Sequence, residues 1–249
     1  MRIYKNKNPY YKSFIIISAA RITLIALPVL ILIFYRWKIG GENYLAGFVF
    51  AALLTLIIFA YLLLSRHYRI LLSGYRGEQK LFKIIKGINR NTDSFECSVF
   101  INLPLRYKNN RSEADMLIVG ERGILLIEVK NHSGIITGEE SHDFWFQHKR
   151  FSEKTKKKML NPVFQLKRQR GIIKSLLRTH GVEAWVENVL FFSNPNVKLN
   201  IKLGKNNRAF SNKDELIKFI NNLKPQTPLT REKCLKITDI IRRMSEQDT

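Results

Sequence analysis

Residues 124–130, Ile-Leu-Leu-Ile-Glu-Val-Lys, decide the fold of this chain of 249 residues. Their apolar and largely β-branched side chains predict a buried strand. Side chains alternate between the two faces of a strand, so Glu128 and Lys130 share one face and Val129 points the other way. Two opposite charges at the end of a buried strand are costly unless something uses them. We therefore expect the strand to form the centre of a sheet and to carry a functional group at its end.

A second strand with an acidic residue lies just upstream. Residues 115–119, Asp-Met-Leu-Ile-Val, are followed by Gly-Glu-Arg-Gly at 120–123, which predicts a β-hairpin with residues 124–130. The face alternation of this hairpin predicts that the carboxylates of Asp115 and Glu128 lie close enough to share one metal ion.

Helices flank the predicted hairpin on both sides in sequence. In the helix expected at 74–88, Glu78 shares the apolar face of Leu81 and Ile85. A second helix opens at Asn161-Pro162, with Asn as N-cap and Pro at the first helical position. Gln165 continues the apolar line of this second helix.

The remaining elements complete a mixed sheet. Residues 186–193 are strongly apolar and predict a strand that runs parallel to the sheet after the crossover helix. Short strands are expected at 94–102, 134–138 and 143–148, and helices at 214–223 and 231–244.

The acidic residues have the chemistry of a metal site. Phosphodiester hydrolysis needs a metal that polarises the phosphate and lowers the pKa of the attacking water. Hard cations such as Mg²⁺, or Mn²⁺ in its place, take oxygen ligands from one or two carboxylates and keep several waters. Asp115 and Glu128 supply two carboxylates, and the backbone carbonyl of Val129 supplies a third oxygen.

Three further residues are candidates for catalysis. Lys130 lies on the face of Glu128 and can orient the water or stabilise developing negative charge. Glu78 would act as an outer ligand or would orient water, and Gln165 would contact a phosphate or a water.

An ordered set of motifs carries a family resemblance. It comprises Gly77-Glu78, Ala114-Asp115, residues 123–131, Gly134-x-Ile136, Trp145 and Asn161-Pro162-x-x-Gln165. In this order the segment 74–193 resembles the nuclease-related domain (NERD) family, a branch of the PD-(D/E)xK nuclease superfamily. Ala114 replaces the nominal Pro of the superfamily, which carries no chemistry. The resemblance implies a restriction-endonuclease-like α/β fold, a mixed β-sheet flanked by helices, and a possible DNase activity.

The apolar composition of the N-terminal region predicts a membrane anchor. Residues 14–35 contain one charge, Arg21, and residues 44–64 contain none, so each is long and apolar enough to span a bilayer. Basic residues precede the first span and follow the second, which predicts that both termini are cytoplasmic. Trp37 and its neighbours Tyr35 and Tyr44 would form an interfacial belt. Arg21 either snorkels to the headgroups or contacts a partner within the membrane.

The charge predicts a polyanionic partner. The chain has 42 basic and 20 acidic residues, a formal charge of +22. Residues 1–64 hold seven basic residues and one acidic residue, so +16 belongs to residues 65–249. Such an excess attracts nucleic acid or an anionic leaflet. The run at 154–158, Lys-Thr-Lys-Lys-Lys, is a solvated loop or, beside a nuclease core, a phosphate contact.

Simpler interpretations exist for the individual residues. Glu128 and Lys130 can form an ordinary ion pair, and Gln165 can be a helix-packing polar residue. The ten- and six-residue gaps between His132, His142 and His148 do not favour zinc. Trp145 and Phe146 can stack a base or fill the core. Cys97 and Cys234 are far apart in the sequence and read as inert reduced thiols.

These patterns predict three segments. Residues 1–65 form the two-helix anchor, 74–195 the nuclease-like domain, and 196–249 a C-terminal helical extension. The first hypothesis is a membrane-anchored, Mg²⁺-dependent nuclease that acts on DNA at the inner face of the cell membrane. The second is a catalytically inactive, tethered nucleic-acid-binding or sensor module.

Overall fold

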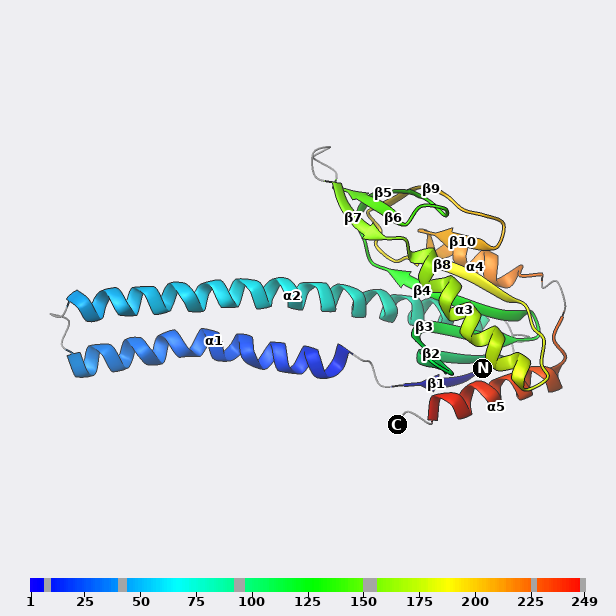
Figure 1. Ribbon diagram of the computed structural model, residues 1–249, viewed down its shortest axis with the longest axis horizontal. Helices are drawn as coiled ribbons and strands as arrows, with labels where there is room; N and C mark the ends of the chain where they lie inside the picture. Colours follow the sequence, from blue (N-terminus) through cyan, green and yellow to red (C-terminus); the bar gives the residue numbers. More distant parts are fainter. Residues whose placement is uncertain (7–9, 40–43, 92–96, 150–155, 225–227, 247–249) are drawn as a thin grey trace. The chain divides into compact units, whose positions relative to one another are not determined.

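The structure is a computed structural model that describes residues 1–6, 10–39, 44–91, 97–149, 156–224 and 228–246 (Figure 1). It divides into two compact units, one formed by residues 8–75 and the other by residues 1–7 and 76–249. The described residues of the first unit are helical, and the second unit contains all of the β-strands described.

Two long helices carry the apolar N-terminal region. Helix α1 is Tyr10–Ile39 and α2 is Tyr44–Asn91. Both are long and apolar enough to cross a membrane, and they contain the two spans expected at 14–35 and 44–64. The helix expected at 74–88 is the C-terminal part of α2. The side chains of the expected aromatic belt, Tyr35, Trp37 and Tyr44, lie outside the described residues.

The single charge within the first span has polar partners on α2. The guanidinium of Arg21 donates to Ser65 Oγ at 3.2 Å and to the hydroxyl of Tyr61 at 3.4 Å. It also lies 4.3 Å from the centre of the Tyr68 ring. The partner of Arg21 is therefore α2, the second helix of the same chain.

A six-stranded mixed sheet forms the centre of the second unit. Its strand order is β1-β2-β3-β4-β8-β10. The strands are β1 Arg2–Lys5, β2 Cys97–Tyr107, β3 Asn110–Gly120, β4 Gly123–Lys130, β8 Val186–Phe192 and β10 Asn207–Phe210. The predicted hairpin is β3–β4, and β8 runs parallel to β4 as expected. Buried apolar side chains on both faces of β4 explain its central position.

A smaller, four-stranded sheet lies beside the first (Figure 1). Its order is β7-β6-β5-β9, with β5 Gly134–Glu139, β6 Phe144–His148, β7 Lys156–Leu160 and β9 Val197–Lys202. The strands expected at 134–138 and 143–148 are present as β5 and β6, which pair antiparallel.

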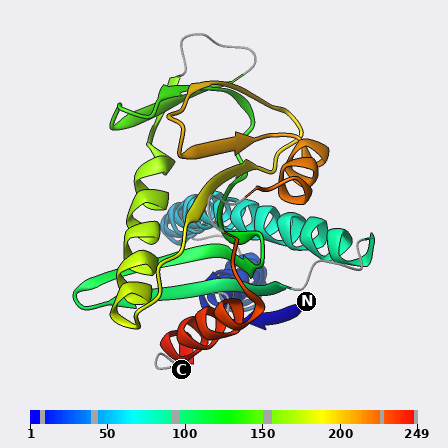
Figure 2. The same cartoon turned by 90° about the vertical axis from the view of Figure 1, so that its right-hand side faces the viewer.

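Helices cover both faces of the six-stranded sheet. Helix α3, Pro162–Thr179, and helix α5, Arg231–Glu246, pack on one face against Leu117 and Leu126. The C-terminal part of α2 and helix α4, Lys213–Asn221, pack on the other face against Ile118 and Ile127. Figure 2 shows α2 and α5 on opposite sides of the β2–β3 hairpin. The mixed α/β fold preceded by two apolar helices is thereby confirmed.

Three segments differ from the prediction. The region 196–249 is more than a helical extension, because β9 and β10 precede α4 and α5 and complete the two sheets. Residues Arg2–Lys5, expected to be only a basic flank, form the edge strand β1. Lys156–Lys158 of the basic run belong to β7 rather than to a loop. β1 and β9 pair with strands that are distant in sequence, whereas β7 pairs with the neighbouring strand β6.

Candidate active site

Two acidic residues lie at the end of the β3–β4 ladder. The ladder ends with the pair of Met116 and Ile127, and Asp115 and Glu128 are the next residues on the two strands. Strand alternation puts both side chains on one face of the sheet. That face is the one covered by α3, because Leu117 and Leu126 alternate in phase with these acids. Asp115 Oδ2 also accepts a hydrogen bond from the backbone N–H of Val129 at 2.7 Å.

The Glu128 carboxylate is held by two donors. Lys130 Nζ lies 2.7 Å from Glu128 Oε1. Gln169 Nε2, from α3, donates to Glu128 Oε2 at 3.0 Å. Glu128 is only 2% exposed and Gln169 is fully buried. A buried carboxylate is stable when it is paired and hydrogen-bonded, and these contacts supply both conditions.

The first turns of α3 contain the two glutamines of the site, Gln165 and Gln169. Gln165 Oε1 accepts from Lys130 Nζ at 3.1 Å, and Gln169 follows one turn later. Asn161 is the N-cap, with its side chain accepting from Val163 N, and Pro162 occupies the first position as predicted. Asn161 Nδ2 donates to the carbonyl of His142 at 2.7 Å. The cap thus ties the first turn of α3 to the β5–β6 turn and sets the position of both glutamines.

Glu78 reaches the site from the opposite side of the sheet. It lies on α2, whose residues Leu81 and Ile85 pack on the other face. Close approach of α2 to the strand ends depends on Gly77, where a Cβ would lie 2.9 Å from Ser193 Oγ and 3.1 Å from Val129 Cγ1. The Glu78 charge raises the pKa of Asp115, although less than the other causes that raise it.

The local pKa values reflect this crowding of acids. Burial first, and then the charge of Glu128, hold the pKa of Asp115 well above its usual range. Burial and Glu128 also raise the pKa of Glu113. The imidazole of His132 has its pKa lowered to about 4 by burial and by the charges of Lys130 and Lys157. A cation bound between Asp115 and Glu128 would offset the repulsion that contributes to the raised pKa of Asp115.

The donor set fits a hard divalent cation. Each carboxylate oxygen has two lone pairs, so an oxygen that accepts one hydrogen bond keeps a second pair for a metal. The N–H of Val129 faces Asp115, and the carbonyl of the same residue points to the same side of the strand. Among the described residues no three His, Cys, Asp or Glu side chains gather as a metal site. Two carboxylates and a carbonyl are nevertheless sufficient for Mg²⁺, which keeps several waters.

The structure brings together four of the five expected catalytic residues, Asp115, Glu128, Lys130 and Gln165, on the face under α3. It also adds residues to which the sequence analysis assigned no role: Gln169, Glu113 and His132. Gln169 could have been found, because it lies one helical turn after Gln165 on the same apolar face.

The aromatic and histidine candidates separate. Trp145 is fully buried, and its indole N–H donates to the carbonyl of Glu139 at 2.9 Å, so it is a core residue. Phe146 is exposed. His148 Nε2 lies 3.1 Å from Thr137 Oγ1 on the second sheet, whereas His142 is exposed in the β5–β6 turn.

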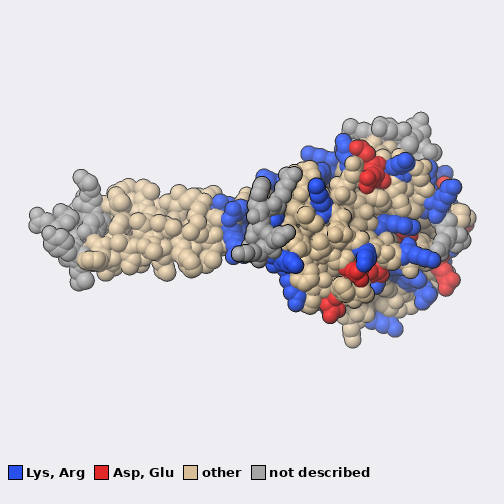
Figure 3. Space-filling view, turned by 90° about the horizontal axis from the view of Figure 1, so that it is seen from above, with Lys and Arg blue, Asp and Glu red and all other residues tan. Residues whose placement is uncertain are grey.

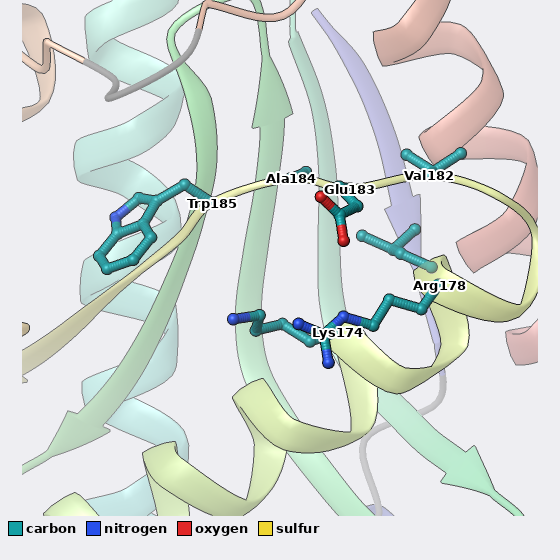
Figure 4. Close-up of a pocket in the computed structure, with 7 residues that line it drawn as sticks. Lys174, Arg178, Val182, Glu183, Ala184 and Trp185 are labelled. Carbon is teal, nitrogen blue, oxygen red and sulfur yellow. The ribbon is translucent and has the colours of Figure 1, made fainter.

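A separate pocket lies at the other end of α3. It has a volume of about 190 Å³ and is lined by Lys174, Arg178, Glu183 and Trp185, among others. Figure 4 shows the Glu183 carboxylate directed toward the ends of Lys174 and Arg178, while the Trp185 ring points away. This pocket lacks a pair of carboxylates, so its chemistry does not match that of the site at Asp115 and Glu128.

Comparison with known families identifies the central part of the chain. Residues 73–193 match the family model of the nuclease-related domain. This range contains α3, the β3–β4 hairpin and every residue of the candidate site. No curated protein and no solved structure matches the chain.

Proposed function

Because residues 73–193 are a nuclease-related domain, we propose that this chain is a membrane-anchored, metal-dependent nuclease that hydrolyses DNA phosphodiesters. The observation that carries the proposal is that Asp115 and Glu128 follow the last pair of the β3–β4 ladder on one face of the sheet, with Lys130 Nζ 2.7 Å from the Glu128 carboxylate. Two acids and a lysine on one face of a hairpin supply the groups that phosphodiester hydrolysis requires.

Asp115, Glu128 and the carbonyl of Val129 would hold Mg²⁺ or Mn²⁺. A bound metal would supply polarisation of the phosphate and a lower pKa for the attacking water. The hydrogen bond from the Val129 N–H fixes the orientation of the Asp115 carboxylate, and the hydrogen bond from Gln169 fixes that of Glu128. These two hydrogen bonds preorganise the carboxylates, so little reorganisation is needed when a substrate binds.

Lys130 is the cationic group of the site. Its ammonium lies between Glu128 Oε1 and Gln165 Oε1, at 2.7 and 3.1 Å. From this position it can donate to an oxygen that gains negative charge in the transition state, or orient the water. Gln165 holds the ammonium and has its own amide N–H₂ as a donor to a phosphate. Glu78 adds negative charge at the rim and can orient water as an outer group.

Charge and anchoring support a nucleic-acid substrate near a bilayer. Figure 3 shows a face of the globular unit on which Lys and Arg patches are more numerous than Asp and Glu patches. The visible surface of the helices in residues 8–75 is largely uncharged.

We propose that α1 and α2 span the cell membrane with both termini in the cytoplasm. Asn43→Cys should then react with an impermeant thiol reagent in intact cells, and labelling only after lysis would contradict this orientation.

The alternative is a catalytically inactive, membrane-tethered nucleic-acid-binding or sensor module. One observation favours it: both oxygens of Glu128 already have protein donors, Lys130 and Gln169. A metal must share these oxygens with strong hydrogen bonds. If the pairing is too stable to be shared, the fold and the basic surface would still bind nucleic acid without cleaving it.

Cleavage assays with Lys130→Ala separate the two functions. The full chain in detergent is incubated with plasmid, linear and single-stranded DNA in the presence of Mg²⁺, Mn²⁺ or EDTA. We expect metal-dependent cleavage by the native chain, cleavage reduced at least about 100-fold in the variant, and salt-sensitive binding in both, because binding rests on many phosphate contacts. Full cleavage by the variant would place the site elsewhere. Binding without cleavage by either protein would establish the inactive module.

A further inference from the structure

The smaller sheet has one buried and one exposed face. Along β6, alternation puts Trp145 and Gln147 on the buried face and Phe144, Phe146 and His148 on the other. Trp145 is fully buried, whereas Phe146 is 38% exposed on an inner strand of the sheet. The outer face therefore presents aromatic rings to solvent.

Lysines flank the aromatic strand on both sides. The exposed lysines on this face are Lys156 and Lys158 of β7 and Lys198 and Lys202 of β9. Lys158 is opposite Phe146, and its Nζ lies 3.5 Å from the centre of the Phe144 ring. Among the described strand residues of this face the only acid is Glu139, which pairs with Lys202 at 2.8 Å. The face is basic with an aromatic centre.

We propose that this outer face binds single-stranded nucleic acid, with a base stacked on Phe146 and phosphates contacted by the lysines of β7 and β9. The inference rests on the proposed function and names its substrate class. Residues two apart on a strand lie about 6.6 Å from each other, so a base on Phe146 is separated from the Phe144 ring, which Lys158 covers. Stacking is sequence-tolerant because every base has a π-face. Bases within a duplex are stacked on each other and cannot occupy this surface.

A simpler role for the lysines does not explain the whole face. Lysines on an edge strand prevent pairing with other chains, which accounts for Lys156 and Lys158 on β7. That role does not require an exposed Phe146 on the neighbouring inner strand. The sheet also borders the candidate active site, because Lys157, on the opposite face of β7, and Lys130 both act on His132. A strand held on the outer face would be close to the proposed catalytic groups.

Binding of oligonucleotides to the full chain in nanodiscs tests the inference. Fluorescence anisotropy with a labelled thymidine 12-mer in EDTA measures binding without cleavage, and a duplex of equal length provides the comparison. Phe146→Leu keeps an apolar side chain but removes the ring, so affinity for the single strand should fall about 5-fold or more. Phe146→Tyr should bind like the native chain. Phe164→Leu, at a similarly exposed Phe on α3, is the matched control.

Several outcomes would overturn the inference. Native affinity in Phe146→Leu, or an equal loss in Phe164→Leu, would show that the ring does not stack a base. An environment-sensitive dye on Phe146→Cys reports the remaining possibility, an anionic bilayer. Emission that responds to the oligonucleotide supports the inference, whereas emission that shifts only in anionic nanodiscs assigns the face to lipid. A wrong assignment of the catalytic site would give a different result. Cleavage would then be unchanged in Lys130→Ala, while Phe146→Leu would still weaken single-strand binding.

Discussion

The contact at Gly77 yields a prediction with a built-in control. A Cβ at this position would lie 2.9 Å from Ser193 Oγ, 3.1 Å from Val129 Cγ1 and 3.3 Å from Asn131 Cβ. At Gly74, one turn earlier on α2, a Cβ would meet no described atom within 4 Å. Both substitutions to Ala gain about 1 kcal/mol of helix propensity. Only Gly77→Ala also incurs the cost of overpacking, which is about 1–3 kcal/mol.

The difference between the two variants therefore isolates the packing cost. We expect Gly74→Ala to raise the free energy of unfolding by about 0.5–1 kcal/mol. Gly77→Ala should be less stable than Gly74→Ala by about 1–3 kcal/mol. For a chain of this size that corresponds to about 3–9 °C in the midpoint of thermal unfolding. The midpoints are measured in the same detergent, at the same scan rate, by circular dichroism.

The same substitution also tests the role of the helix in the site. To relieve the contact, α2 must move away from the strand ends and take Glu78 with it. If Glu78 contributes to cleavage as proposed, Gly77→Ala should lose activity while keeping its affinity for DNA. Equal thermal midpoints for Gly77→Ala and Gly74→Ala would refute the reasoning, because they would show that α2 does not approach the strands closely.

Three further changes have defined outcomes. Asn161→Ala removes the N-cap of α3 and the donor to the carbonyls of Glu140 and His142, so chemical denaturation should show a loss of about 2–3 kcal/mol, and Asn161→Asp should lie between this variant and the native chain. Gln169→Leu leaves Glu128 Oε2 without its donor and should lower stability by about 1–3 kcal/mol, whereas an unchanged thermal midpoint would mean that the hydrogen bond is dispensable. The folded pKa of His132, about 4, is below the unfolded value of about 6.5, so the unfolded state binds the proton first and stability falls as the pH drops from 6.5 toward 4. This loss is up to about 3 kcal/mol, and midpoints at pH 7 and 4.5 should differ less in His132→Gln than in the native chain, with equal differences contradicting the assignment.

The helix cap, the hairpin and the buried strands could be predicted from residues that are close together in the sequence. The N-cap and first-position Pro of α3 appeared where Asn161-Pro162 predicted them. The β3–β4 hairpin and the parallel strand β8 also followed from short apolar runs bounded by turn residues. Caps, turns and strand alternation depend on neighbours within a few residues, so a single sequence contains the information that determines them.

Several short strands could not be predicted from the sequence. Arg2–Lys5 and Asn207–Phe210 are polar at half of their positions and become strands only by pairing with β2 and β8. Lys156–Lys158 were interpreted as a solvated run because consecutive lysines lack the apolar alternation of a strand, although their partner is the neighbouring strand β6. Their strand β7 is an edge strand, and edge strands tolerate charged side chains.

The two-residue period of a strand and the short turn at 120–123 are enough to predict that Asp115, Glu128 and Lys130 share one face of a hairpin. Which helix covers that face depends on the tertiary structure. It placed α3 there, with Gln165 on Lys130 and the buried Gln169 on Glu128, and it brought α2 to the opposite side with Gly77 at the closest approach. The physical reason is that helix placement depends on which apolar stripe fills which face of the sheet, a property of packing among segments far apart in the chain.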